Sequence, residues 1–223
     1  MKASAADVTP STRSARARDK LMHTAERLYA EHGFANVSIR MIGEAAGQRN
    51  KSAVQYHFST RDELIQAILT RHAEAIERHR APMAAALEGS GEVSLRDWIA
   101  CVIVPSIEHH IELGTPSWYG RFLAQAVVEP SLREYVIQAH LRTPSFRRLE
   151  QLRPPRGQDR DPELTARNAA MTRQLIVHMS AELEADLAGG RIPAAEAERS
   201  WRRLGETLIT AICGLSSALL GSA

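Results

Sequence analysis

The chain has 223 residues, of which 44% are hydrophobic and 24% charged, as in a globular protein of one large or two small domains. No segment approaches the roughly 18 consecutive apolar residues that span a membrane, and no hydrophobic signal core follows Met1, so we expect a cytoplasmic protein with no membrane partner. Two cysteines, Cys101 and Cys213, exclude a disulfide framework and indicate buried, reduced thiols.

The formal net charge of +2 is unevenly distributed. Residues 13–61 carry a surplus of five positive charges, which leaves a surplus of three negative charges on the rest of the chain. A basic segment beside a neutral or acidic body is typical of proteins that bind nucleic-acid phosphates. By itself, such a modest cluster is more often a solvated surface.

The pattern of residues predicts an all-α fold of about nine helices, because aromatic residues make up only 5% and alternating runs of Val, Ile and Thr are missing. Residues 1–12 are small and polar, and we expect a disordered arm there. The arm leads to Arg13, Arg16 and Arg18, which could enter a DNA minor groove or simply keep the tail soluble. The first helix is predicted over 15–32, ending before Gly33.

Two short helices are predicted next, separated by a turn. Ser38 is a suitable N-cap for the first, and Gly47 can adopt the left-handed conformation that ends it. The second runs over about 51–57, with Val54 and Phe58 facing inward. Two short helices joined by a tight turn indicate a helix-turn-helix, whose second helix enters the DNA major groove. A third helix then begins with a capping box, Thr60-x-x-Glu63.

This part of the chain resembles the DNA-binding domain of the TetR/AcrR family of transcriptional regulators. The resemblance rests on G-F-A-N-V-S-I-R-M-I over 33–42, A-A-G over 45–47, Q-Y-H-F over 55–58 and S-T-R-D-E-L over 59–64. One feature departs from the family pattern: Gly47 and Phe58 are eleven residues apart instead of ten. Whether Arg49, Asn50 or Lys51 comes first on the recognition helix therefore stays open.

The predicted contacts with DNA divide by chemistry. Amide, hydroxyl and cationic groups that can reach base edges are Asn50, Lys51, Ser52 and Gln55, with Arg49 beside them. Side chains placed for phosphates are Ser38, Tyr56, His57 and Arg61, and the resemblance implies the same role for the Tyr-His pair. Alternatively, Tyr56 and His57 only seal the small core.

The predicted domain boundary lies near residue 80, because Pro82 and Gly89-Ser90-Gly91 are expected to end the third helix. Residues 13–80 would form the DNA-binding domain, and residues 81–223 a body that binds an effector and dimerises. Pro105 falls inside the next helical pattern and should kink it, which can widen a cavity. Candidate pocket residues, each of which would also fit an ordinary core, are Trp98, Cys101, Pro105, His109, Trp118, Phe122 and His140.

The last two predicted helices, 161–188 and 194–220, are long and amphipathic. They suit an antiparallel pair that meets a second copy as a four-helix bundle, and the resemblance implies the same homodimer. The alternative is that both apolar stripes face one internal core. The predicted interface residues are Leu175, Met179, Leu204, Leu208, Ile212 and Leu215.

We find no sign of an enzyme, a cofactor or a metal site. No Glu is followed by His three residues later, and neither G-x-x-x-x-G-K-[ST] nor G-x-S-x-G occurs. The chain is therefore interpreted as a sequence-specific regulator that a small-molecule effector releases from a double-stranded DNA operator. The alternatives are an activator, or a helical ligand-binding or enzymatic bundle with a vestigial DNA-binding head.

Overall fold

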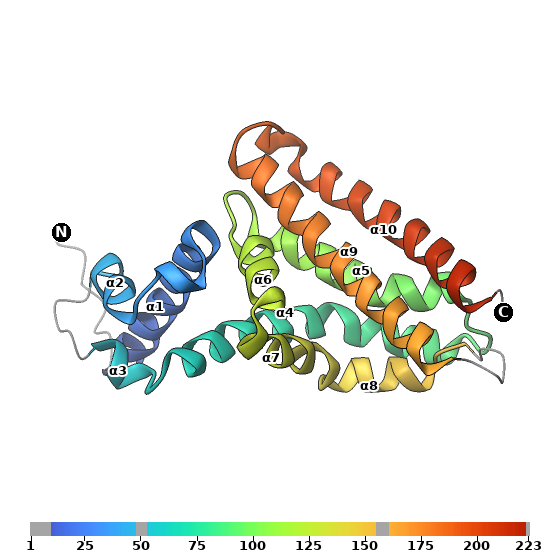
Figure 1. Ribbon diagram of the computed structural model, residues 1–223, viewed down its shortest axis with the longest axis horizontal. Coiled ribbons are helices and arrows are strands. Elements are labelled where there is room, and N and C mark those ends of the chain that lie inside the picture. Colours follow the sequence, from blue (N-terminus) through green and yellow to red (C-terminus); the bar gives the residue numbers. More distant parts are fainter. Residues whose placement is uncertain (1–9, 48–52, 155–160, 222–223) are drawn as a thin grey trace, which may run out of the picture.

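The computed structural model describes residues 10–47, 53–154 and 161–221, and this part of the chain consists of helices joined by turns and loops, without strands. The all-α prediction is confirmed. Helices α1 to α3 form a head at one end, and α4 runs from it into a bundle made by the remaining helices (Figure 1). The α-helices are α1 Pro10–His32, α2 Ile39–Ala45, α3 Ala53–His57, α4 Arg61–Gly89, α5 Leu95–Leu113, α6 Tyr119–Val128, α7 Pro130–Leu141, α8 Pro144–Gln151, α9 Pro162–Ala188 and α10 Ala197–Leu220, with 3-10 turns at Phe34–Asn36 and Ala194–Glu196.

The helix ends in the head follow from local side-chain chemistry. Ser38 Oγ accepts the backbone N–H of Met41 at 3.2 Å, which caps α2. Gly47 closes the same helix with a φ of 70°, a conformation that costs other residues energy. Thr60 Oγ1 accepts the N–H of Glu63 at 3.1 Å, and Glu63 reaches back to the N–H of Ser59 at 2.7 Å. The predicted caps are confirmed, with Glu63 bonding one residue earlier than expected.

Helix α4 does not end near Arg80, so that prediction was wrong. It continues through Pro82 to Gly89. Pro82 lies on the exposed side of the helix, where water can bind the carbonyl group that loses its backbone partner. The predicted boundary between residues 80 and 81 therefore falls inside one continuous helix that belongs to both the head and the body.

Pro105 also lies inside a helix. Here a side chain replaces the backbone hydrogen bond that the proline cannot make. Proline cannot donate to the carbonyl group four residues earlier, which is that of Cys101. Arg80 Nε donates to this carbonyl at 3.2 Å. Arg80 is buried, its guanidinium carbon lies 5.4 Å from the centre of the Phe146 ring, and burial lowers its pKa. Arg80 thus joins α4 to α5 at the proline.

The buried apolar side chains form two clusters. The first fills the head and continues into α6 and α7, so that Tyr29 and Phe34 of the head pack with Phe122 of α6. The second lies among α5, α8, α9 and α10. The head is therefore not packed as a separate unit, because its core extends into the body.

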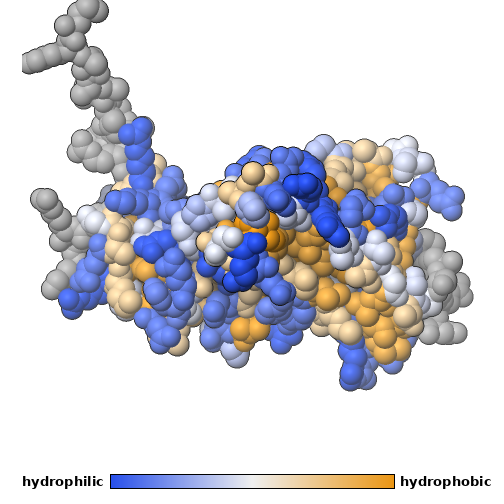
Figure 2. Space-filling model, turned by 90° about the horizontal axis from the view of Figure 1, so that it is seen from above, coloured by the Kyte–Doolittle hydropathy of each residue, from blue (hydrophilic) through white to orange (hydrophobic). Residues whose placement is uncertain are grey.

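Helices α9 and α10 pack against each other along the upper side of the body in the view of Figure 1. By length and composition, the segment Ala194–Leu220 could cross a membrane, a test that the core helix of a soluble protein also passes. In its most apolar window only 28% of the residues are buried within the subunit. Hydrophobic residues gather on the face seen in Figure 2 at the end away from the head.

Candidate functional site

The head places α3 across α2 at close range, with one side of α3 left open. A Cβ atom on Gly43 would lie 3.1 Å from Cγ2 of Val54, so the small residue permits the close crossing. Val54 and Phe58 are buried, as predicted. On the other side of α3, Gln55 is exposed and Tyr56 is 80% exposed. An exposed helix side of this kind is what a helix-turn-helix presents to the DNA major groove.

The structure describes only some of the residues that were predicted to contact DNA. Arg49, Asn50, Lys51 and Ser52 lie outside the described residues. Gln55 and Tyr56 share the open side of α3, and the His57 ring lies 5.0 Å from that of Tyr56, edge to face. Ser38 is exposed at the start of α2, where it serves as the cap.

Arg61 is held by the head itself. Its Nη2 donates to the carbonyl oxygen of Phe34 at 2.6 Å, and its guanidinium carbon lies 5.5 Å from the ring centre of Tyr29. These contacts favour a structural role over the predicted phosphate contact. Sequence reasoning did not single out Lys20, whose Nζ would lie 3.5 Å from a Cβ atom on Gly47. This exposed ammonium group lies beside the turn and is better placed for a phosphate.

The residues predicted to wall an effector pocket do not come together. Of the seven, only His109 and Trp118 line the pocket found among the described residues where the head meets the body. Phe122 is fully buried in the first cluster, while Trp98 and Cys101 belong to the second, where Trp98 Nε1 donates to the Leu149 carbonyl at 2.8 Å. Pro105 is buried within α5, and the side chain of His140 lies outside the described part of the chain.

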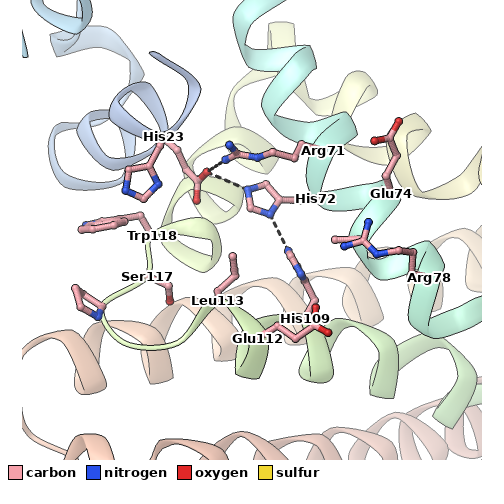
Figure 3. Close-up of a pocket in the computed structure, with 13 residues that line it drawn as sticks. His23, Arg71, His72, Glu74, Arg78, His109, Glu112, Leu113, Ser117 and Trp118 are labelled. Carbon is pink, nitrogen blue, oxygen red and sulfur yellow. Dashed lines mark hydrogen bonds and ion pairs between the residues drawn. The ribbon is translucent and has the colours of Figure 1, made fainter. Parts of the chain in front are cut away.

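The pocket lies where the head meets the body and has a volume of about 420 Å³. Helix α1 contributes His23 and Glu26, and the loop before α6 contributes Pro116, Ser117 and Trp118. His23 and Trp118 lie at one end, and Glu74 and Arg78 of α4 at the other (Figure 3). The remaining lining residues are Arg71, His72, Ala75, His109, Glu112 and Leu113. We call this cavity the junction pocket.

A hydrogen-bonded chain of buried groups crosses the junction pocket and links three helices. Glu26 Oε2 of α1 lies 3.0 Å from Nε2 of His72 on α4, and Nδ1 of His72 lies 2.7 Å from Nε2 of His109 on α5 (Figure 3). Arg71 Nη2 also donates to Glu26 Oε2 at 2.5 Å. Burial alone would raise the pKa of Glu26, but the hydrogen bond from His72 and the charge of Arg71 lower it overall. Glu26 is therefore ionised.

Acid should destabilise the protein through two buried histidines. Burial, together with the charge of His72, lowers the pKa of His109 to about 2 and that of His110 to about 3. Below about pH 6.5 these two histidines take up protons in the unfolded chain but not in the folded chain. The free energy of unfolding therefore decreases as the pH is lowered. We expect a loss of roughly 1 kcal/mol per pH unit for each histidine between about pH 6.5 and pH 5.

Urea unfolding at several pH values measures this slope. The variant His110→Phe is the comparison, because a phenyl ring can keep the stacking on Trp201, where the ring centres lie 4.3 Å apart. It should remove about half of the slope. Equal stability of the wild-type protein at both ends of this pH range would contradict the burial argument.

The six residues predicted to form a dimer interface differ in how far their side chains are exposed. Leu208 and Ile212 are 3% and 2% exposed and pack in the second cluster, so their side chains have no surface left for a partner. Leu175, Leu204 and Leu215 are half-buried, and Met179 is 39% exposed. Sequence reasoning passed over two further exposed apolar side chains of α9, Leu164 and Met171.

Comparison with known proteins agrees with the geometry of the head. Residues 21–68 match the bacterial regulatory proteins of the tetR family. A solved structure from Rhodococcus sp., assigned to TetR-family transcriptional regulators, is 18% identical with a TM-score of 0.49, over 87% of this chain and 99% of that one. A second, from Mesorhizobium loti, is also 18% identical with a TM-score of 0.44, over 90% and 98%. A search of curated proteins gave no match.

Proposed function

We propose that this chain, whose residues 21–68 match the bacterial regulatory proteins of the tetR family, is a DNA-binding transcriptional regulator that represses transcription as a cytoplasmic homodimer. The observation that carries the proposal is the open side of α3, where Gln55 and Tyr56 are exposed while Val54 and Phe58 of the same segment are buried. A helix with this division of its sides can enter a major groove without rearrangement of the head.

Dimerisation is part of the proposal because a single short helix buries too little surface for tight, specific binding. Helix α9 exposes Leu164, Met171 and Met179, and Leu204, Leu215 and Leu219 of α10 are half-buried. Pairing of these helices with a second copy would cover that surface. The two heads must then lie about 34–36 Å apart to reach successive major grooves.

The division of the chain into a DNA-binding domain, 13–80, and an effector-binding body, 81–223, is kept as a functional proposal. The link between them is mechanical, since α4 is continuous and the first cluster joins the head to α6. A small molecule that binds better to a dimer with another head spacing would lower the operator affinity by the ratio of its two affinities.

Gln55 provides the test of DNA recognition. Its amide can pair with a base edge, so Gln55→Ala should weaken binding to the preferred duplex by about 1–3 kcal/mol, or roughly 10- to 100-fold, and relax the preference at particular base pairs. Selection from random duplexes, followed by gel-shift titration with DNA that flanks the gene, measures both effects. Unrelated duplexes should be bound as before.

Two other head variants complete this experiment. Lys20→Ala should weaken all duplexes about equally and reduce the salt slope by roughly one, as expected for a phosphate contact. Thr70→Ala, an exposed change on α4, is the control and should have no effect. If wild-type protein binds no duplex more tightly than random DNA at two salt concentrations, a helical ligand-binding bundle with a vestigial head becomes the better interpretation.

A further inference from the structure

The hydrogen-bonded chain through Glu26, His72 and His109 links the head to the body (Figure 3). Glu26 belongs to α1, His72 to the head end of α4 and His109 to α5, and these side chains are 3%, 2% and 4% exposed. Both hydrogen bonds go through ring nitrogens, so each bond exists only while the right nitrogen carries a proton. The number of protons in this chain therefore decides whether it holds. We call the chain the histidine link.

The histidine link has room for two ring protons. Glu26 is ionised and accepts, so Nε2 of His72 donates to its Oε2 at 3.0 Å. Nδ1 of a neutral His72 is then a lone pair, and it accepts from Nε2 of His109 at 2.7 Å. Two neutral imidazole rings carry two N–H groups in all. Every ring proton of the link is thus already used in a hydrogen bond.

A third proton finds no acceptor in the link. Nδ1 of His109 is buried and has no hydrogen-bond partner among the residues that the structure describes. A third proton on this atom would make a buried N–H group without an acceptor. If the third proton went to Nδ1 of His72 instead, two N–H groups would face each other unless the His109 proton moved to that same enclosed Nδ1. The intact link therefore excludes a third proton.

The positive charges around His109 also oppose a third proton. Burial is the largest cause that lowers the pKa of His109 to about 2, and the charges of four neighbours lower it further. Those neighbours are His72, Arg78 and His79 of α4 and His110 of α5. An imidazolium at His109 would thus be both desolvated and repelled.

The acidic groups nearby are engaged elsewhere. Glu26 already accepts two hydrogen bonds at Oε2, and Oε1 of Glu112 lies 3.0 Å from Nε2 of His79. Tyr119 of α6 lies edge-on to the His109 ring with 5.4 Å between ring centres, and burial raises its pKa, so it is neutral. The other titratable groups that line the junction pocket are His23, Arg71 and Glu74.

Opening of the histidine link removes these obstacles. When α1 and the head end of α4 separate from α5, His109 reaches water and regains an ordinary pKa near about 6.5. Below that pH the open form binds one proton more than the closed form, so each further pH unit favours opening about 10-fold. The separated head also loses Phe122 of α6 from its core, where the ring packs with Tyr29 and Phe34. The helices of the head should then exchange their amide hydrogens faster.

Complete unfolding is a different reaction, because it also exposes His110. This side chain lies in the body, stacked on Trp201 with 4.3 Å between ring centres, and it takes no part in the histidine link. Opening of the link takes up one proton, whereas unfolding takes up a second one at His110. The two reactions therefore differ in their dependence on pH.

From this geometry we propose that the histidine link is a proton-sensitive switch between the head and the body. In acid, a proton taken up at His109 separates the head from α5 and α6. Operator affinity then falls, because the heads of a dimer are no longer held at a fixed spacing. The loss of affinity rests on the proposed regulatory function, whereas the opening itself does not.

Hydrogen exchange of the full-length protein, read by mass spectrometry between about pH 6 and pH 5, tests the opening. Protection factors, which correct for the pH dependence of free amides, should fall about 10-fold per pH unit in α1. In α10, whose exchange requires complete unfolding, they should fall about 100-fold per pH unit. A constant protection factor in α1, or a slope in α1 as steep as that in α10, would overturn the proposal.

Two histidine variants assign the slope in α1. His109→Gln places an amide near the position of Nε2, which can bond to His72 but binds no proton, so the slope in α1 should disappear. His110→Phe, the matched control, should leave the slope in α1 unchanged and reduce that in α10 to about 10-fold. Circular dichroism establishes that each variant is folded. A slope in α1 that persists in folded His109→Gln, or disappears in His110→Phe, refutes the proposal.

A gel shift at pH 7 and pH 5.5 tests the regulatory step separately. Operator affinity of the wild-type protein should fall at least about 5-fold more than that of His109→Gln. His57 of the head is present in both proteins, so its own titration cancels. Equal losses of affinity together with a clear exchange slope would refute the regulatory step. The same slope without DNA binding at either pH would refute the proposed function and leave the histidine link intact.

Discussion

Replacement of Glu184 by leucine should lower the free energy of unfolding by about 3–5 kcal/mol, because it removes one member of a buried ion pair. Glu184 of α9 is 1% exposed and accepts four hydrogen bonds. The donors are Ser117 Oγ at 2.9 Å, the N–H of Gly120 at 2.9 Å, and the N–H and Nε of Arg121 at 3.0 and 3.1 Å.

These bonds fix the beginning of α6 against α9. A Cβ atom on Gly120 would lie 3.2 Å from the Ser180 carbonyl oxygen, so the two helices are already in close contact there. Without the carboxylate, two backbone N–H groups and the Arg121 guanidinium lose their acceptor at a place that water cannot easily enter. Glu184→Gln keeps part of the acceptor capacity and should lose about half as much.

Urea unfolding measures both variants. Glu182→Leu is the control, since Glu182 is exposed on the same helix and should change stability by less than about 0.5 kcal/mol. If Glu184→Leu is no less stable than this control, the carboxylate does not hold α6, and our account of the junction between α6 and α9 is wrong.

The second large effect is expected at Phe122. Phe122→Ala should cost about 3–5 kcal/mol, because the side chain is fully buried between the head and α6. Its ring centre lies 5.5 Å from that of Phe34 and 6.3 Å from that of Tyr29. The cavity left behind would also loosen the head from the body, so that the head should unfold before the bundle.

Two probes can separate these transitions during urea unfolding. Near-ultraviolet circular dichroism reports aromatic packing, and hydrogen exchange reports α1 and α10 individually. The transitions should coincide in the wild-type protein and separate in Phe122→Ala. Val128→Ala, an exposed change on the same helix, is the control. A single shared transition in Phe122→Ala would contradict the idea that this ring couples head and body.

The head could be predicted well because its signals are local. Ser38, Gly47 and Thr60 act within one turn of their own positions, so the sequence around each residue was enough to place a helix end. The continuation of α4 past Pro82 was missed, because a proline interrupts a helix only where its surroundings cannot satisfy the freed carbonyl group. Exposure decides this outcome, and it depends on tertiary packing.

The junction pocket could not be predicted, since its walls come from segments far apart in the chain. Glu26 lies within the apolar pattern of α1, between Ala25 and Tyr29, and that unusual position was the available signal. Its partners on α4 and α5 become visible only once those helices are packed. Phe122 fits the same lesson, because an aromatic residue on an amphipathic helix looks alike whether it walls a pocket or fills a core.

The contact between Arg80 and the carbonyl group of Cys101 sets how α4 can move. That contact fixes the middle of α4 to α5, and a sliding motion would break it and leave a buried cation and a buried carbonyl group without each other. A tilt of α4 about Arg80 preserves this hydrogen bond. The nineteen-residue arm from there to Arg61 is about 29 Å long, so a swing of about 5° displaces its tip by roughly 2.5 Å. Pro105, which leaves the Cys101 carbonyl group free to accept from Arg80, thereby provides a pivot about which the head end of α4 can tilt.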